Sequence, residues 1–304
     1  MIENHSSASA QIARVPVIVW AGPVFVLVWS TGFIVARYGM PYTDPMTFLT
    51  MRFAGVLVVM IPLAWLWKVQ WPSGRQMGHI ALAGLMMHVG YLGGVWTAIK
   101  MGMPAGLSAL IVGLQPVLTA VLAARLAEHV SKRQWMGLLL GLTGVAIVLG
   151  DKIELDGVTW VSTAFCFMAL LAMTSGTLYQ KRFCPKFDFR AGSVVQYGAS
   201  GVVTASLMLL LEPVHVDWNL QVVAALVWSV LPLSIGAMSL WFLLLQRGQA
   251  TRVSSLMYLT PPTTAIMAWF LLGEALTLWV MLGTAVTVIG VWLVTHGRRE
   301  QPSR

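Results

Sequence analysis

Residues 17–36 read VIVWAGPVFVLVWSTGFIVA, a stretch of twenty positions without one charged side chain. An α-helix needs about 20 apolar residues to cross the hydrocarbon core of a bilayer. A barrel strand would instead alternate apolar and polar residues over about ten positions, and no such alternation is present. The stretch is also too long for the apolar region of a signal peptide. It therefore predicts a retained membrane-spanning helix.

Nine further apolar stretches of similar length follow, with short connections between them. The ten predicted spans cover residues 17–36, 45–67, 79–99, 104–124, 134–150, 158–179, 192–211, 222–245, 252–272 and 277–296. Apolar residues make up 58% of the 304 positions and charged residues 10%, against about 25% charged residues in a soluble domain. The composition predicts an all-α membrane protein with ten transmembrane helices, the lipid bilayer as its surroundings, and no separate soluble domain.

The basic residues orient these helices. Ten spans place both termini on one side, and the segments of that side hold fifteen of the nineteen lysines and arginines. The opposite side holds three, Arg37, Lys100 and Lys152, and Arg52 lies within a span. Because cytoplasmic segments carry the excess of positive charge, we expect a multi-pass protein with both termini in the cytoplasm. The same bias accounts for the net charge of +8 without a nucleic-acid partner.

The two halves of the chain resemble each other at an offset of about 145 residues. The matched positions include Gly32 with Gly176, Arg52-Phe53 with Gln196-Tyr197, Trp96 with Trp241, Pro116 with Pro261, and Glu128 with Glu274. Each half holds five spans, and an odd number makes the second half enter the membrane from the opposite side. We therefore expect two inverted-topology repeats, residues 1–152 and 153–304. Inverted repeats are typical of secondary transporters that work by alternating access.

Several short motifs resemble a known family. They are WSTGFIVAR at 29–37, Met51-Arg52-Phe53, Leu114-Gln115-Pro116, Leu259-Thr260-Pro261 and Gly273-Glu274. With two halves of five helices, the chain resembles the drug/metabolite transporter superfamily in its ten-helix EamA-like branch. The resemblance implies export of amino acids and related metabolites across a bacterial inner membrane. It also implies a central cavity lined by spans 1, 3, 4, 6, 8 and 9, with spans 5 and 10 at the periphery.

Matched prolines indicate where a substrate would bind. Pro116 lies in the middle of span 4, and Pro261 and Pro262 lie at the corresponding depth of span 9. Proline removes a helix hydrogen bond, and matched helix breaks in two repeats point to a binding site. A plain structural kink is the alternative. Gln115 and Thr260 flank the prolines and offer hydrogen bonds to a substrate.

A histidine and an arginine lie well inside predicted spans, away from the span ends. His88, near the middle of span 3, could couple protons or bind substrate while neutral; a polar contact between helices is the alternative. Arg52 in span 2 could bind a substrate carboxylate or could extend to the membrane surface. The span cores contain no Asp or Glu, which argues against a carboxylate proton relay and against a strongly cationic substrate.

Aromatic residues complete the candidate site. Trp29, Tyr91, Trp96, Tyr179 and Tyr258 lie in spans that the resemblance assigns to the cavity, and aromatic rings with a polar tip suit a small amphipathic solute. Packing against lipid or against other helices is the alternative for each of them.

The sequence argues against other functional classes. The six histidines are scattered, no metal-ligand cluster or glycine-rich phosphate loop is present, and no cofactor is expected. We therefore predict a transporter rather than an enzyme. It would export a small polar or amphipathic metabolite, such as an amino acid or a derivative; uptake or exchange of another small compound is the alternative. Gly137 and Gly141 in span 5 and Gly283 and Gly290 in span 10 predict close packing, either within a monomer or in a homodimer.

Overall fold

The computed structural model describes residues 15–119, 122, 132–152, 158–184, 187–241 and 259–296, and these residues form helices joined by short connections. The elements are α2 (Val15–Gly39), α3 (Pro45–Leu66), α4 (Gly74–Gly84), η1 (Leu85–Leu92), α5 (Gly93–Lys100), α6 (Ala105–Val112), α8 (Lys132–Lys152), α9 (Trp160–Phe183), α10 (Phe189–Leu211), α11 (Leu220–Trp228), η2 (Ser229–Ala237), α14 (Thr260–Leu272) and α15 (Leu278–His296). The segments η1 and η2 are π-helical, and each continues the α-helices on either side of it.

Over their described residues the ten predicted spans fall on these helical regions, which confirms an all-α membrane protein. Residues 120–121 and 123–124 of the fourth span, 242–245 of the eighth and 252–258 of the ninth lie outside the described part of the chain. Six described helices are long and apolar enough to cross a membrane, at 20–39, 45–66, 74–100, 160–183, 189–211 and 220–241. Shorter apolar helices cover 105–119, 135–148 and 278–293. The third helix begins at Gly74, five residues before the predicted start, because Ser73 caps it and accepts a hydrogen bond from the Gln76 amide.

Polar side chains fix several other helix ends. Thr159 and Ser162 form a capping box at the start of α9, and Asn219 Oδ1 accepts from the Val222 amide at the start of α11. Asp188 caps α10, and its hydrogen bond from the Arg190 guanidinium holds the pKa of this carboxyl below its ordinary value. Helix α14 ends at Gly273, whose φ of +68° favours glycine.

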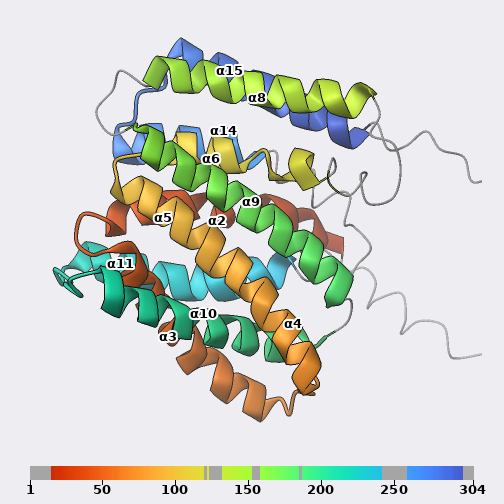
Figure 1. Ribbon diagram of the computed structural model, residues 1–304, viewed down its shortest axis with the longest axis vertical. Coiled ribbons are helices and arrows are strands. Elements are labelled where there is room, and N and C mark those ends of the chain that lie inside the picture. The colour runs from red at the N-terminus through yellow and green to blue at the C-terminus, as the bar shows by residue number, and fades with distance from the viewer. Residues whose placement is uncertain are drawn as a thin grey trace, which may run out of the picture.

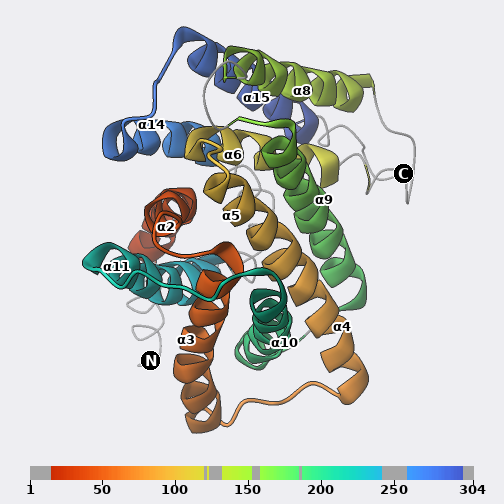
Figure 2. The ribbon, with the colours of Figure 1, turned by 60° about the vertical axis from the view of Figure 1, so that its left-hand side comes forward.

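The helices pack in pairs that join the two halves of the chain. Helix α3 packs on α10, α6 on α14, and α8 on α15. The run from α4 through η1 to α5 packs on α9, and correspondingly α11 and η2 pack on α2. An offset of about 145 residues exchanges the members of the first three pairings and carries the fourth pairing onto the fifth, so the contacts have a twofold pattern. Figures 1 and 2 show α8 and α15 side by side at one edge of the bundle, with α6 and α14 next to them and α3 at the opposite edge.

Glycines bring α8 and α15 into backbone contact. A Cβ atom on Gly290 would lie 2.6 Å from the Gly137 carbonyl oxygen and 2.6 Å from the Gly141 amide nitrogen. A Cβ atom on Gly144 would likewise clash with Thr287 and with the backbone of Gly283. The small residues predicted to form packing surfaces therefore pack within the chain, since a larger side chain would separate the two helices.

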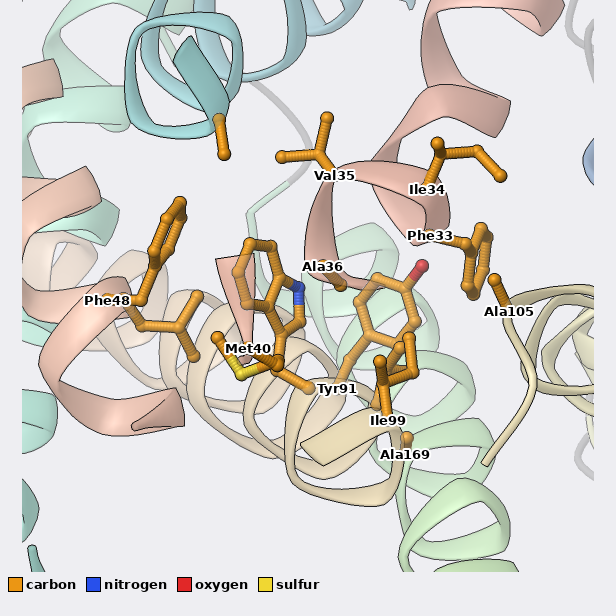
Figure 3. Packing of buried hydrophobic residues seen from close by; sticks show 14 of the residues in the cluster. Phe33, Ile34, Val35, Ala36, Met40, Phe48, Tyr91, Ile99, Ala105 and Ala169 are labelled. Atoms are coloured by element: carbon orange, nitrogen blue, oxygen red, sulfur yellow. The ribbon is translucent and has the colours of Figure 1, made fainter. Parts of the chain in front are cut away.

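The largest buried cluster lies where α2, α3, η1 and α5 meet (Figure 3). Phe48 and Trp96 are fully packed, with ring centroids 4.5 Å apart. Figure 3 shows Phe33 and Tyr91 close together, from α2 and η1. This cluster holds together the helices that also line the central cavity.

Candidate functional site

Two adjoining pockets lie in the centre of the bundle. The first, which we call the Arg52 pocket, is lined by Trp29, Gly32, Phe33, Arg52, Met87, His88, Tyr91, Leu92, Val95, Trp96, Met173, Tyr197, Leu233 and Met238. The second, the Gln115 pocket, is lined by Trp29, Phe33, Tyr91, Ala109, Val112, Gly113, Gln115, Pro116, Met173 and Thr260. Four lining residues are common to both, so the pockets are neighbours, and each is lined by residues from both halves of the chain.

The π-helical segments supply part of the wall of the Arg52 pocket. His88 and Tyr91 lie in η1, and Leu233 lies in η2. The two segments occupy corresponding places in the two halves, because the offset of about 145 carries residues 85–92 onto 230–237. Isolated π-helical turns are rare and often occur at functional sites. The matched irregularity in spans 3 and 8 is a feature that the sequence analysis missed, although Pro232 in η2 marks one of the two positions.

Arg52 reaches across the pocket to the second half. Its side chain is 6% exposed, and Nε donates a hydrogen bond of 3.0 Å to Ser234 Oγ in η2. Ser234 Oγ donates in turn to the Ser229 carbonyl oxygen over 2.8 Å. The i to i−5 spacing of this second bond is that of a π-turn. The guanidinium is therefore held inside the bundle and does not extend to the membrane surface.

His88 is buried among aromatic rings. Its ring stacks on Tyr197, with centroids 4.5 Å apart, and lies near Phe53. The side chain is 6% exposed, and Nε2 has no hydrogen-bond partner. The Tyr197 hydroxyl donates to the Ser234 carbonyl oxygen over 3.4 Å. Because an unsatisfied buried polar atom is costly, His88 Nε2 is a candidate contact for a substrate.

The Gln115 pocket lies at a break in the fourth helix. Helix α6 ends at Val112. Gly113 and Leu114 then form a turn, and the helix resumes before Pro116. A Cβ atom on Gly113 would lie 2.5 Å from Pro261 Cγ, so the break packs directly against the start of α14. Pro261 and Pro262 lie in the first turn of α14, where a missing N–H costs no hydrogen bond.

Most of the predicted site residues meet at these pockets. Trp29, His88, Tyr91 and Trp96 line the first pocket, and Gln115, Pro116 and Thr260 line the second. Tyr179 lines neither; its hydroxyl is 2.7 Å from His79 Nδ1, at one end of the bundle. Tyr258 lies outside the described residues.

The lining differs from the expected set of helices in one respect. Spans 2 and 7 contribute Arg52 and Tyr197 besides the six helices that the resemblance named, whereas α8 and α15 line neither pocket. Ser234, Met173 and Leu233 were also missed, because a lone serine, methionine or leucine in an apolar span gives no signal of its own.

One end of the bundle is closed by contacts between the two halves. We call this end, which holds residues 40–44, 101–104, 212–219 and 273–277 (left in Figure 1), the Lys100 end. The Glu212 carboxylate accepts hydrogen bonds from the Met46 and Thr47 amides, both over 2.7 Å, at the start of α3. The Glu274 carboxylate accepts from the Ala105 amide over 2.7 Å and from the Gly106 amide over 3.2 Å, at the start of α6. Each contact pairs an anion with the positive end of a helix dipole.

Further contacts strengthen the Lys100 end. Lys100 Nζ pairs with the Asp44 carboxylate at 3.1 Å and donates to the Met40 and Thr43 carbonyl oxygens. The Asp217 amide donates to the Tyr42 carbonyl oxygen over 2.8 Å, beside a bridge between Thr43 and Val216. These polar contacts form a layer at this end of the bundle.

Comparison with known proteins identifies the family to which this chain belongs. The model of the EamA-like transporter family matches residues 17–150 and again residues 160–296. The chain belongs to the EamA-like transporter family. Each of the two matches covers five of the predicted spans of this family member.

Relatives of this family member cover nearly its whole length. An uncharacterized inner membrane transporter of Escherichia coli (strain K12), YedA, is 24% identical over 285 residues, which cover 93% of this chain and 92% of the relative. A probable amino-acid metabolite efflux pump of Salmonella typhimurium (strain LT2) is 25% identical over 284 residues, which cover 90% and 93%. A crystal structure with 18% sequence identity has the same fold, with a TM-score of 0.66 over 93% of this chain and 99% of that one. The chain is therefore a membrane transporter.

Proposed function

We propose that this transporter exports a small polar or amphipathic metabolite, an amino acid or a derivative, across a bacterial inner membrane by alternating access. The observation that carries the proposal is a central pair of pockets lined by both halves of the chain. Two inverted repeats, residues 1–152 and 153–304, could open these pockets first to one side and then to the other. The Salmonella relative, named a probable amino-acid metabolite efflux pump, supports the substrate class.

The charge bias supports an orientation for this cycle. The Lys100 end lies on the side that holds three basic residues, and the opposite side holds fifteen. The positive-inside rule then places the Lys100 end outside the cytoplasm and both termini within it. In this orientation the contacts of Glu212 and Glu274 join the two halves on the outer side, and export requires these contacts to break.

Counterflow in proteoliposomes tests the proposed function. Vesicles that hold the full-length protein and a high internal concentration of one unlabelled amino acid or derivative are diluted into a trace of the same labelled compound. We expect at least one compound of the panel to accumulate transiently, above protein-free vesicles. If no amino acid or derivative exchanges, the proposed substrate class is wrong.

His88 offers a test of the binding site. Because Nε2 is buried without a partner and borders the Arg52 pocket, we expect His88→Ala to slow counterflow by about tenfold, the loss of one polar contact of about 1.4 kcal/mol. His79→Ala, at the end of the bundle, is the matched control. Equal transport by His88→Ala and wild type, at equal reconstitution, would remove His88 from the site.

The same residue is our candidate for proton coupling. The described spans hold no carboxylate for this role, and His88 is an imidazole that lines the central cavity. A proton-coupled exporter would show substrate movement driven by an imposed pH gradient, and the counterflow that His88→Ala retains would no longer respond to this gradient. If the imposed pH gradient does not change the rate of substrate movement by the wild-type protein, the proposed proton coupling is wrong.

A further inference from the structure

Arg52 places a permanent positive charge beside the central cavity. A guanidinium stays protonated in proteins and carries five N–H donors. The one hydrogen bond described for this side chain uses Nε, toward Ser234 Oγ. The side chain lines the Arg52 pocket, so its remaining donors are available to a ligand there.

No carboxylate in the described part of the chain forms an ion pair with Arg52. The ion pairs among the described residues are Lys100 with Asp44, Arg190 with Asp188, and His215 with Asp217. In the full sequence, moreover, all eleven acidic residues lie outside the ten apolar spans. A buried charge without a counter-ion costs several kcal/mol, and an anion that enters the pocket would recover part of this cost.

A second polar side chain lines the same pocket. His88 is more than nine-tenths buried, and its Nε2 has no hydrogen-bond partner. A neutral imidazole that carries its proton on Nε2 donates there. In this tautomer His88 adds one N–H donor to those of Arg52 among the residues that line the pocket.

Apart from the side chains of Tyr91 and Tyr197, the rest of the pocket is mostly apolar. It is lined by Trp29, Phe33, Leu92, Val95, Met173 and Leu233. No carboxylate lines it, so a substrate ammonium would find no ion-pair partner among the described residues. The pocket is built for a molecule with one anionic end and an apolar body.

We propose that Arg52 binds the carboxylate of a small organic acid with an apolar body, that His88 donates a second hydrogen bond to it, and that a free amino group contributes nothing to recognition. This inference rests on the proposed function and narrows its substrate class. N-acylated amino acids should then bind at least as tightly as the parent amino acids.

Three probes of matched shape test the inference on the wild-type protein. They are N-acetyl-L-leucine, L-leucine and L-leucinamide, and binding is measured by calorimetry on full-length protein in detergent. We expect N-acetyl-L-leucine to bind at least as tightly as L-leucine. L-leucinamide, which lacks the carboxylate, should bind about tenfold to hundredfold more weakly than L-leucine, the value of one or two charge-assisted hydrogen bonds. Equal binding of the amide and the acids, or tighter binding of L-leucine than of its N-acetyl form, would overturn the inference, as would binding of none of the three.

Two variants separate recognition from folding. Arg52→Gln introduces a glutamine, the residue type found at the matching position of the other repeat, Gln196. Arg52→Lys keeps the positive charge but loses the planar guanidinium with its paired N–H donors. We expect Arg52→Gln to remove the preference for acid over amide and Arg52→Lys to keep part of it. A structural role alone would weaken acid and amide equally, and this result would overturn the inference. Counterflow of other solutes by wild type would still support the proposed function, whereas its complete absence would count against that function itself.

Discussion

Gly290→Ala is expected to destabilise the protein by about 1–3 kcal/mol, the usual cost of adding a methyl group to a tightly packed contact. The new Cβ would lie 2.6 Å from two backbone atoms of α8, which cannot rotate away as a side chain can. Helix α15 must then move away from α8. Thermal unfolding in detergent, followed by the loss of monodisperse protein, measures the effect.

Gly198→Ala is the matched control for this prediction. Gly198 lies within α10, and a Cβ atom there would meet nothing within 4 Å. Alanine stabilises a helix relative to glycine by up to about 1 kcal/mol, so the control should melt at the wild-type temperature or above it. Equal melting of the Gly290 variant and the control would contradict the packing of α8 on α15 through glycine.

The double variant Glu212→Gln, Glu274→Gln is expected to open the Lys100 end. Each carboxylate accepts hydrogen bonds from two backbone amides of the other half. The glutamine side chain has one acceptor oxygen, and its NH2 group would face some of these backbone N–H donors. A hydrogen bond to a charged group is worth about 1.5–3 kcal/mol, so each substitution should favour the outward-open state about tenfold or more. The rate at which a membrane-impermeant thiol reagent, added outside, labels a cysteine in the Arg52 pocket measures this population.

Asp217→Asn provides the control for that experiment. Its carboxylate lies at the same end but is largely exposed and pairs with His215, only two residues away. The substitution removes a negative charge without breaking a side-chain contact between the halves, and it should leave the labelling rate unchanged. If the double variant is labelled no faster than this control, Glu212 and Glu274 do not hold the Lys100 end closed.

The sequence predicted those features that depend on the length and composition of single segments. The helices follow from apolar runs such as residues 17–36, and the glycines of spans 5 and 10 predicted packing surfaces, though not that these two helices pack on each other. His88 and Gln115 were found because polar residues are conspicuous in apolar spans. Each of these signals is local and can be read without knowing which helices are neighbours.

The remaining features depend on contacts between distant parts of the chain. Arg52 and Ser234 are 182 positions apart, and Glu212 lies 166 positions from Met46. Only the packed structure decides whether Arg52 points into the cavity or toward the membrane surface. The π-helical turns of η1 and η2 likewise carry no compositional mark, because their residues resemble those of any apolar helix.

Alternating access through the central cavity is the core of this account, and the accessibility of one pocket residue tests it most directly. Leu233 lines the Arg52 pocket and is 6% exposed. Leu233→Cys, in a background in which Cys166 and Cys184 are replaced by alanine, is treated with an anionic, impermeant methanethiosulfonate from either side of oriented vesicles. We predict labelling from both sides and protection from both by a transported substrate. Labelling from one side alone under all conditions, or labelling that a transported substrate does not slow, would contradict the account.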